Sequence, residues 1–136
     1  MITRGVKQGG VLSPQLFNFY INELISTVES LEFGCRVNGT KISILGYCDD
    51  MLTASLTINN MKTIIETCVE FGKKWLVKFN AKKSVIMNCG KKVFQDSEIE
   101  IKMEGKVMPV MDACKYLGII IDTTKKDDVQ VIEKYK

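Results

Sequence analysis

The first regular pattern in the chain is a set of apolar residues that recur at three- and four-residue intervals. Its members are Leu16, Phe17, Tyr20, Ile21, Leu24, Ile25 and Val28. This spacing predicts an amphipathic helix over about 13–28, because such residues fall on one side of a 3.6-residue turn. Ser13 is expected to be the N-cap and Pro14 the first helical residue, since both residue types favour those positions.

A second apolar pattern predicts another amphipathic helix, from about Asn59 or Asn60 to about Val77. A turn at Asn80 and a strand over 84–88 should follow it. The residues expected on its buried face are Met61, Ile64, Ile65, Cys68, Val69, Gly72, Trp75 and Leu76.

Between the two helices, short extended segments alternate with turn residues. The Asn38-Gly39 pair within CRVNGTKISIL predicts a hairpin, because this dipeptide suits a two-residue connection between antiparallel strands. Residues 41–47 and 51–55 are expected to be extended. That leaves Cys48-Asp49-Asp50 as the connection between two strands.

The last third of the chain predicts further strands, over 99–103, 106–108 and 116–122, with a hairpin turn at Glu104-Gly105 between the first two. The pattern as a whole predicts an α+β fold. We expect an antiparallel palm-type sheet with two amphipathic helices packed on one face.

Composition limits the classes of protein that the chain can represent. It has 136 residues, of which 46% are hydrophobic and 26% charged, the balance of one globular domain. It contains no histidine, and its five cysteines form no CxxC pair, which disfavours a zinc site or a Cys-His nucleophile. No apolar run is long enough to span a bilayer, and the start lacks the apolar core of a signal peptide. We expect an intracellular protein with free thiols and no membrane partner, in a compartment that the sequence does not specify.

Charge adds one open question. The net charge is only +3, but lysines gather in one region: Lys73, Lys74, Lys78, Lys82, Lys83, Lys91 and Lys92. Such a cluster can hold the phosphates of a polyanion, and it can equally be a solvated helix face with its following turn. Charge alone does not separate these two interpretations.

The main chemical candidate is the adjacent pair Asp49 and Asp50, which interrupts an otherwise apolar segment. Two carboxylates at a tight turn repel each other, and a divalent cation such as Mg²⁺ removes that penalty. With a third carboxylate, two metals about 3.5–4 Å apart can run in-line phosphoryl displacement. Asp-Asp is also a common turn dipeptide that binds nothing, so the dipeptide by itself leaves both interpretations open.

Four segments occur in a characteristic order across residues 4–122: RGVKQGGVLSPQLFNFYINEL, GYCDD, LVKFNAKKS and KYLGIII. In this order they resemble the middle and end of a reverse transcriptase palm. The resemblance is to the branch of non-LTR retrotransposons, retrons and group II introns, and within it most of all to the retrotransposons. The resemblance implies RNA-directed DNA synthesis by two-metal nucleotidyl transfer. The implied partners of a complete enzyme are an RNA template, a DNA primer and deoxynucleoside triphosphates, with Mg²⁺ or Mn²⁺ as the cofactor.

The resemblance also implies a role for each matching residue of the catalytic segments. Asp49 matches the metal-ligating aspartate of the turn, Asp50 matches its less critical neighbour, and Tyr47 matches the aromatic residue before them. Cys48 occupies the variable position of this motif. Lys83 matches the lysine near the triphosphate or pyrophosphate, although the adjacent Lys82 offers an alternative register.

The remaining matches concern nucleic acid and nucleotide. The resemblance places three residues, Gln8, Gly9 and Gly10, in the loop under the templating base and incoming nucleotide. It places Ser13 and Pro14 at the start of the adjoining helix. It also implies a primer-grip hairpin at Tyr116, Leu117 and Gly118. Taken singly, Gln8 fits an ordinary polar loop residue at least as well. In the same way Lys83 fits a solvated turn charge, and residues 116–118 fit a core strand.

One part of the family pattern has no match in this sequence. The family places another metal-binding aspartate on a strand upstream of the glycine loop, yet only seven residues precede Gln8. We therefore expect residues 1–122 to be a partial palm without that strand and without fingers, and 123–136 to be a charged tail at the start of a missing thumb. Such a chain should bind metal weakly, be inactive alone, and self-associate through an unpaired strand edge.

Other functions stay open on the sequence alone. The chain can be a noncatalytic nucleic-acid-binding remnant of a retroelement, the translation product of a decayed element, or a plain α+β structural protein. The sequence does not distinguish a truncated gene product from a decayed element. It also does not specify the template, the priming mechanism, any accessory domain or the oligomeric state.

Overall fold

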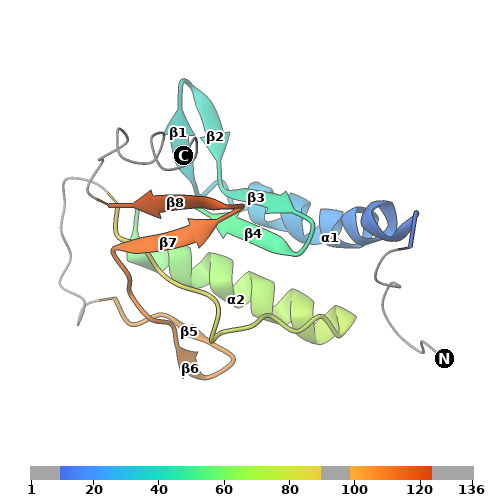
Figure 1. Cartoon of the computed structure of the whole chain (residues 1–136). Coiled ribbons are helices and arrows are strands. Elements are labelled where there is room, and N and C mark those ends of the chain that lie inside the picture. The colour runs from blue at the N-terminus through green and yellow to red at the C-terminus, as the bar shows by residue number, and fades with distance from the viewer. Residues whose placement is uncertain (1–9, 90–98, 124–136) are drawn as a thin grey trace, which may run out of the picture. The chain divides into compact units, whose positions relative to one another are not determined.

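The computed structural model of the chain describes residues 10–89 and 99–123, which form two compact units divided between Val77 and Lys78 (Figure 1). The first unit contains α1 (Ser13–Ser30), β1 (Cys35–Val37), β2 (Thr40–Ile42), β3 (Ile44–Tyr47), β4 (Asp50–Thr53) and α2 (Ile58–Trp75). The second unit contains β5 (Lys102–Met103), β6 (Lys106–Val107), β7 (Ala113–Tyr116) and β8 (Ile119–Asp122). The predicted α+β class is confirmed.

Helix α1 begins one residue earlier than the sequence predicts. Leu12, not Ser13, occupies the N-cap position, so Ser13 is the first helical residue and Pro14, which was expected there, is the second. The main-chain N–H of Ser13 donates to the carbonyl of Gly10 at 3.1 Å, and that of Leu16 donates to the carbonyl of Leu12 at 3.0 Å. These bonds start the helical turn before Ser13, which is why the expected serine cap is wrong.

The predicted apolar face of α1 is buried mainly in the C-terminal half of the helix. Ile21, Leu24 and Val28 are buried, whereas Leu16, near the start, is 56% exposed. The contact with β3 lies in the same half, at Ile25. The helical periodicity therefore predicted the correct face, but not how far along the helix it is covered.

Helix α2 has a cap that the sequence analysis did not identify. The side-chain oxygen of Thr57 accepts a hydrogen bond from the main-chain N–H of Asn60 at 3.1 Å, which satisfies one of the free donors at the helix start. The helix ends at Trp75, and its C-cap residue Leu76 adopts φ 59° and is 69% exposed. The predicted burial of Leu76 is wrong because this left-handed residue leaves the buried face. Phe71 is buried instead.

The strands form four separate two-stranded antiparallel sheets within the described residues, β1–β2, β3–β4, β5–β6 and β7–β8, and not the single sheet that the sequence analysis expected. Each strand is only two to four residues long. The predicted turns at Asn38-Gly39 and Glu104-Gly105 are confirmed. Both residues of each turn have positive φ, as does the Leu117-Gly118 pair, which fits type I′ hairpin turns.

Two further strand predictions for the second unit need correction. The strand expected over 84–88 is reduced to one parallel bridge between Ile86 and Val110, with hydrogen bonds from Ile86 N–H to the Pro109 carbonyl and from Met111 N–H to the Ile86 carbonyl, each 2.9 Å. The strand expected over 116–122 is interrupted by the turn between β7 and β8. Among its described residues, the buried apolar ones are Ala81, Ile99, Ile101, Met103 and Met108.

Some sequence predictions lie outside the described residues. These are Gln8 and Gly9 of the glycine loop, Lys91 and Lys92 of the lysine cluster, and the tail beyond Thr123. Across residues 10–89 and 99–123, neither helix combines the length and apolar character that a membrane span requires.

Candidate active site

The turn that carries the two aspartates is shorter than the sequence predicts. Cys48 and Asp49 form a two-residue connection, and Asp50 is already the first residue of β4, paired with Tyr47. Cys48 has φ 51°, whereas Asp49 is not among the residues with positive φ. This combination fits a type II′ turn, whose first position normally takes glycine. The three-residue connection is wrong because Cys48 takes a conformation that few side chains adopt.

The β3–β4 hairpin packs on α1 through one face. A Cβ atom on Gly46 would lie 3.5 Å from Cδ1 of Ile25, so the Gly46 side of the hairpin faces α1. Because successive strand residues point to opposite faces, Tyr47 and its partner Asp50 lie on the other face. Tyr47 is 64% exposed there. In Figure 1 the turn points along α1, towards the N-terminal end of that helix.

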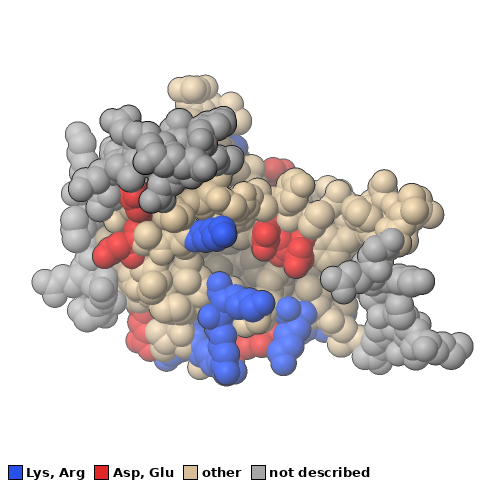
Figure 2. Space-filling view, viewed as in Figure 1, with Lys and Arg blue, Asp and Glu red and all other residues tan. Residues whose placement is uncertain are grey.

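The two carboxylates are presented to solvent. Asp49 and Asp50 are both exposed, and Figure 2 shows acidic side chains on the surface at the β3–β4 turn. Their oxygens are the hard ligands that Mg²⁺ and Mn²⁺ prefer, so the donor set fits such an ion. In the part of the chain that the structure describes, no group of three or more His, Cys, Asp or Glu residues is placed to hold a metal. The turn therefore offers two protein ligands.

A tight contact fixes the base of this hairpin. Ser43, which joins β2 to β3, is 2% exposed, and its hydroxyl donates to the carbonyl of Phe33. The carbonyl of Ser43 accepts from the N–H of Ala54 at 2.9 Å, which extends the β3–β4 pairing. Gly34 has φ 148°, and a Cβ atom there would lie 2.7 Å from the carbonyl oxygen of Ile42. Only glycine fits at position 34, where the main chain passes close to Ile42, without a shift of the main chain.

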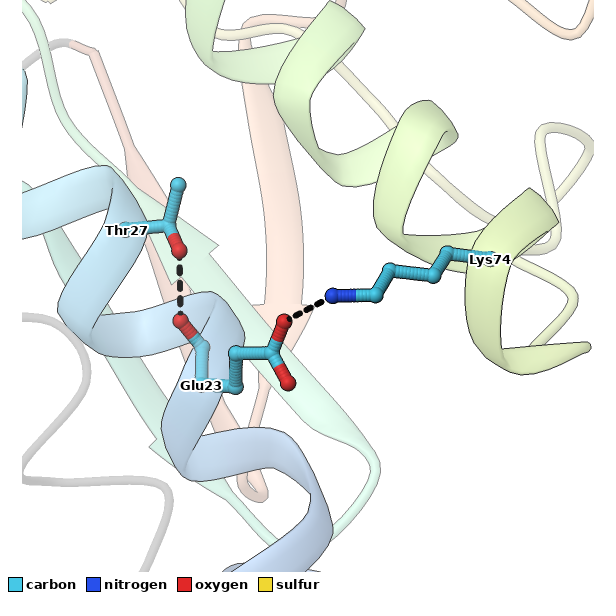
Figure 3. Close-up of polar contacts among 3 residues, drawn as sticks. All are labelled: Glu23, Thr27 and Lys74. Atoms are coloured by element: carbon cyan, nitrogen blue, oxygen red, sulfur yellow. Dashed lines mark hydrogen bonds and ion pairs between the residues drawn. The ribbon is translucent and has the colours of Figure 1, made fainter.

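An ion pair joins α1 to α2 (Figure 3). Oε1 of Glu23 lies 2.7 Å from Nζ of Lys74, and the carbonyl of Glu23 accepts from the Thr27 hydroxyl. The hydrogen bond from Lys74 lowers the pKa of the Glu23 carboxyl. The buried indole N–H of Trp75 has no hydrogen-bond partner among the described residues. Both charged side chains are largely exposed, so the pair adds little stability.

Aromatic rings accompany this ion pair. The ring of Tyr20 meets that of Trp75 edge-on with centroids 5.1 Å apart, and the ammonium of Lys74 lies 5.1 Å from the Trp75 centroid. Sequence reasoning missed the Tyr20–Trp75 contact, because its residues are 55 positions apart and no local spacing links them. The contacts between Tyr20, Glu23 and α2 hold α1 against α2, and α1 in turn packs on the β3–β4 hairpin at Gly46.

The lysine candidate lies on a turn of the second unit, where the predicted turn at Asn80 is confirmed. Oδ1 of Asn80 accepts from the N–H of Lys82 at 3.1 Å, and the carbonyl of Asn80 accepts from the N–H groups of Lys83 and Ser84, each at 3.0 Å. The side chains of Lys82 and Lys83 are both exposed. The match to Lys83 and not to Lys82 stays a prediction.

The remaining candidates fall into two groups. Gly10, Ser13 and Pro14 lie at the start of α1, in the same unit as the Asp49–Asp50 turn. Tyr116, half-buried at the end of β7, and the turn residues Leu117 and Gly118 belong to the second unit, together with Lys83. Each group is thus built by its own unit.

Cysteine chemistry gives a direct test of the turn's exposure. Cys48 is exposed at the turn, whereas Cys68 is buried in α2, and burial raises the pKa of the Cys68 thiol to about 11. At pH 8 this lowers the thiolate fraction of Cys68 roughly 100-fold. We expect iodoacetamide at pH 8 to modify Cys48 and spare Cys68 in the folded chain, as measured by peptide mass mapping. Equal labelling of the two without denaturant would show that the turn or helix α2 is misplaced.

Comparisons with known proteins agree with the sequence motifs. The family model described as reverse transcriptase (RNA-dependent DNA polymerase) matches residues 1–121. The chain is 32% identical over 124 residues to the retrovirus-related Pol polyprotein from the type-1 retrotransposable element R2 of Popillia japonica, covering 86% of this chain and 17% of that protein. It is 27% identical over 130 residues to the RNA-directed DNA polymerase from the mobile element jockey of Drosophila melanogaster, covering 89% of this chain and 13% of that protein.

A third relative is the Pol polyprotein from the type-2 element R2DM of Drosophila melanogaster, 32% identical over 80 residues, or 59% of this chain and 8% of that protein. The chain thus spans less than a fifth of the length of each of these three relatives.

Proposed function

The chain belongs to the reverse transcriptase family, and we propose that within a complete protein it takes part in template-directed synthesis of DNA from RNA. Its reverse transcriptase domain is of the kind found in non-LTR retrotransposon proteins. The observation that supports a catalytic role is the exposure of two adjacent carboxylates, Asp49 on the two-residue turn and Asp50 at the start of β4. This hairpin is held against α1 through Gly46. We further propose that residues 1–122 form part of the palm.

In this proposal Asp49 and Asp50 hold the divalent metal that reverse transcriptases use, with Asp49 the more important ligand. When bound, the ion stabilises the negative charge that develops on the reacting phosphate. Tyr47 shares the exposed face of Asp50 and would contact the nucleotide or template beside it. Because the described residues provide only two carboxylates at this turn, we expect weak binding of Mg²⁺ or Mn²⁺ by the chain alone.

The other proposed contacts are with nucleic acid and nucleotide. Gly10, together with Gln8 and Gly9, would lie under the templating base and incoming nucleotide, with Ser13 and Pro14 starting the adjoining helix. The exposed ammonium of Lys83 would contact the triphosphate or pyrophosphate. The exposed turn between β7 and β8 suits a grip on the primer by Tyr116, Leu117 and Gly118. The partners would be an RNA template, a DNA primer and deoxynucleoside triphosphates.

A metal titration tests the proposed site in the chain itself. We expect electron paramagnetic resonance to show weak binding of Mn²⁺, with a Kd of about 1 mM or higher, because few protein ligands are present. Asp49→Asn should weaken it about fivefold or more. Asp112→Asn is the matched control, since it removes the same charge from an exposed aspartate of the second unit. Equal Kd values for Asp49→Asn and the unmodified chain would contradict the proposed site.

A second candidate function is binding of nucleic acid without chemistry. The observation that favours it is the pair of exposed lysines, Lys82 and Lys83, on the Asn80 turn. This function predicts RNA binding that falls steeply with salt and is unaffected by a chelator or by Asp49→Asn, together with no measurable Mn²⁺ affinity at the turn. A Kd for Mn²⁺ that depends on Asp49 separates the two functions.

A further inference from the structure

The β1–β2 hairpin carries positive charge that the proposed catalytic site does not use. From Phe33 to Cys48 the chain contains no acidic residue and two basic ones, Arg36 and Lys41. These two residues are direct cross-strand partners in the hairpin. Their Cβ atoms therefore lie on the same face, about 5 Å apart, and like charges at such positions repel each other.

The contacts of the two side chains separate the charged groups without neutralising either of them. Nη1 of Arg36 donates to the carbonyl of Gly39 at 3.1 Å, and Nζ of Lys41 donates to the carbonyl of Glu29 at 2.7 Å. Within residues 10–89 and 99–123 neither cation forms a salt bridge with a carboxylate. The two bonds draw Arg36 towards the hairpin turn and Lys41 towards the end of α1. Neutral carbonyl groups do not cancel either charge.

The position of the hairpin makes the Arg36 end of this face accessible, whereas Lys41 is half-buried. Figure 1 shows the β1–β2 turn extending away from α1 and α2, and the residues of the turn end, from Arg36 to Thr40, are all exposed. An anion bound along this face would offset the repulsion between the two cations. The free donors of a guanidinium match the oxygens of a phosphate in a two-point contact, and an ammonium adds a second charge contact.

We propose that the β1–β2 hairpin binds the phosphodiester backbone of a nucleic acid strand through Arg36 and Lys41. The proposal rests on the proposed function, which brings nucleic acid to the protein, but it names a contact surface separate from the Asp49–Asp50 turn. Binding here is independent of base sequence, because only phosphates are contacted. It also requires no metal.

Fluorescence anisotropy of the 136-residue chain with a labelled single-stranded RNA of mixed sequence tests the proposal. We expect Arg36→Gln to weaken binding about fivefold at low salt and to reduce the slope of log K against log salt by about 0.7, the value for one phosphate contact on a single strand. Arg36→Lys should keep most of that slope because it keeps the charge. Lys41→Gln should act in the same direction, but it also removes a bond to α1, so Arg36→Gln is the primary variant.

Lys106→Gln is the control, since Lys106 is an exposed hairpin lysine whose cross-strand partner is Met103 and not a cation. Circular dichroism checks that each variant is folded.

Unchanged RNA affinity in folded Arg36→Gln, or an equal loss in Lys106→Gln, would overturn the proposal. Competition by an acidic peptide as effective as that by unlabelled RNA would overturn the assignment to nucleic acid. Binding that depends on Arg36 but not on Asp49 supports the hairpin contact whatever the fate of the metal site.

Discussion

Asp49→Asn is expected to lower primer extension by about 100-fold or more in a polypeptide that joins this chain to its flanking reading frame. Such a loss corresponds to about 2.7 kcal/mol of transition-state stabilisation. Asparagine keeps the size of the side chain but removes the charge that holds a divalent ion. The measurement is incorporation of deoxynucleotides on an RNA template with a DNA primer and Mg²⁺.

Two variants make this result specific. Asp50→Asn should have a smaller effect, because Asp50 is proposed to be the less critical ligand, and Asp112→Asn should have none. The 136-residue chain by itself should not extend a primer, since only two carboxylates gather at its turn among the described residues. Retention of more than a tenth of the activity in Asp49→Asn, or robust extension by the isolated chain, would contradict the assigned roles.

Gly34→Ala is expected to destabilise the first unit by roughly 3 kcal/mol, the upper end of the common range for single substitutions. The methyl group would lie 2.6 Å from the Ser43 hydroxyl oxygen and 2.7 Å from the carbonyl oxygen of Ile42, and alanine would also have to adopt φ 148°. The main-chain carbonyl cannot move aside without breaking the strand arrangement that leads into β3. Urea denaturation followed by circular dichroism measures the change in the free energy of unfolding.

Gly46→Ala provides the matched control. Its Cβ would meet only Cδ1 of Ile25, at the ordinary contact distance of 3.5 Å, and Gly46 has no positive φ. We expect a change below about 0.5 kcal/mol, because the site requires no rearrangement. Equal urea midpoints for the two alanine variants would show that the main chain at Gly34 does not lie as close to Ile42 as in the structure.

The sequence predicted local elements well where a single periodicity or turn dipeptide decides the conformation. The apolar spacing in α1 and the Asn38-Gly39 pair act within a few residues, so both appear as expected. The errors arise where the main chain takes an unusual conformation. Leu76 and Cys48 have positive φ, which no pattern of apolar and polar residues indicates for side chains other than glycine.

Long-range organisation was less predictable. The expectation of one continuous sheet required strands to pair beyond their own hairpins, and the structure shows only hairpin partners among the described strands. At the candidate site, Asp49 and Asp50 could be identified because they are adjacent to each other and belong to the recognisable segment GYCDD. The Glu23–Lys74 contact could not, because it depends on how two helices separated by 27 residues of hairpin and loop cross.

The exposure of both carboxylates at one turn can be tested most directly by nuclear magnetic resonance. The measurement is the Mn²⁺-induced broadening of amide signals in the ¹H–¹⁵N spectrum of the chain. The account predicts that signals from Tyr47 to Met51 broaden first, that those around Asp112 in the second unit stay sharp, and that Asp49→Asn abolishes the effect. Broadening that begins around Asp112, with the signals of the β3–β4 turn unchanged, would contradict it.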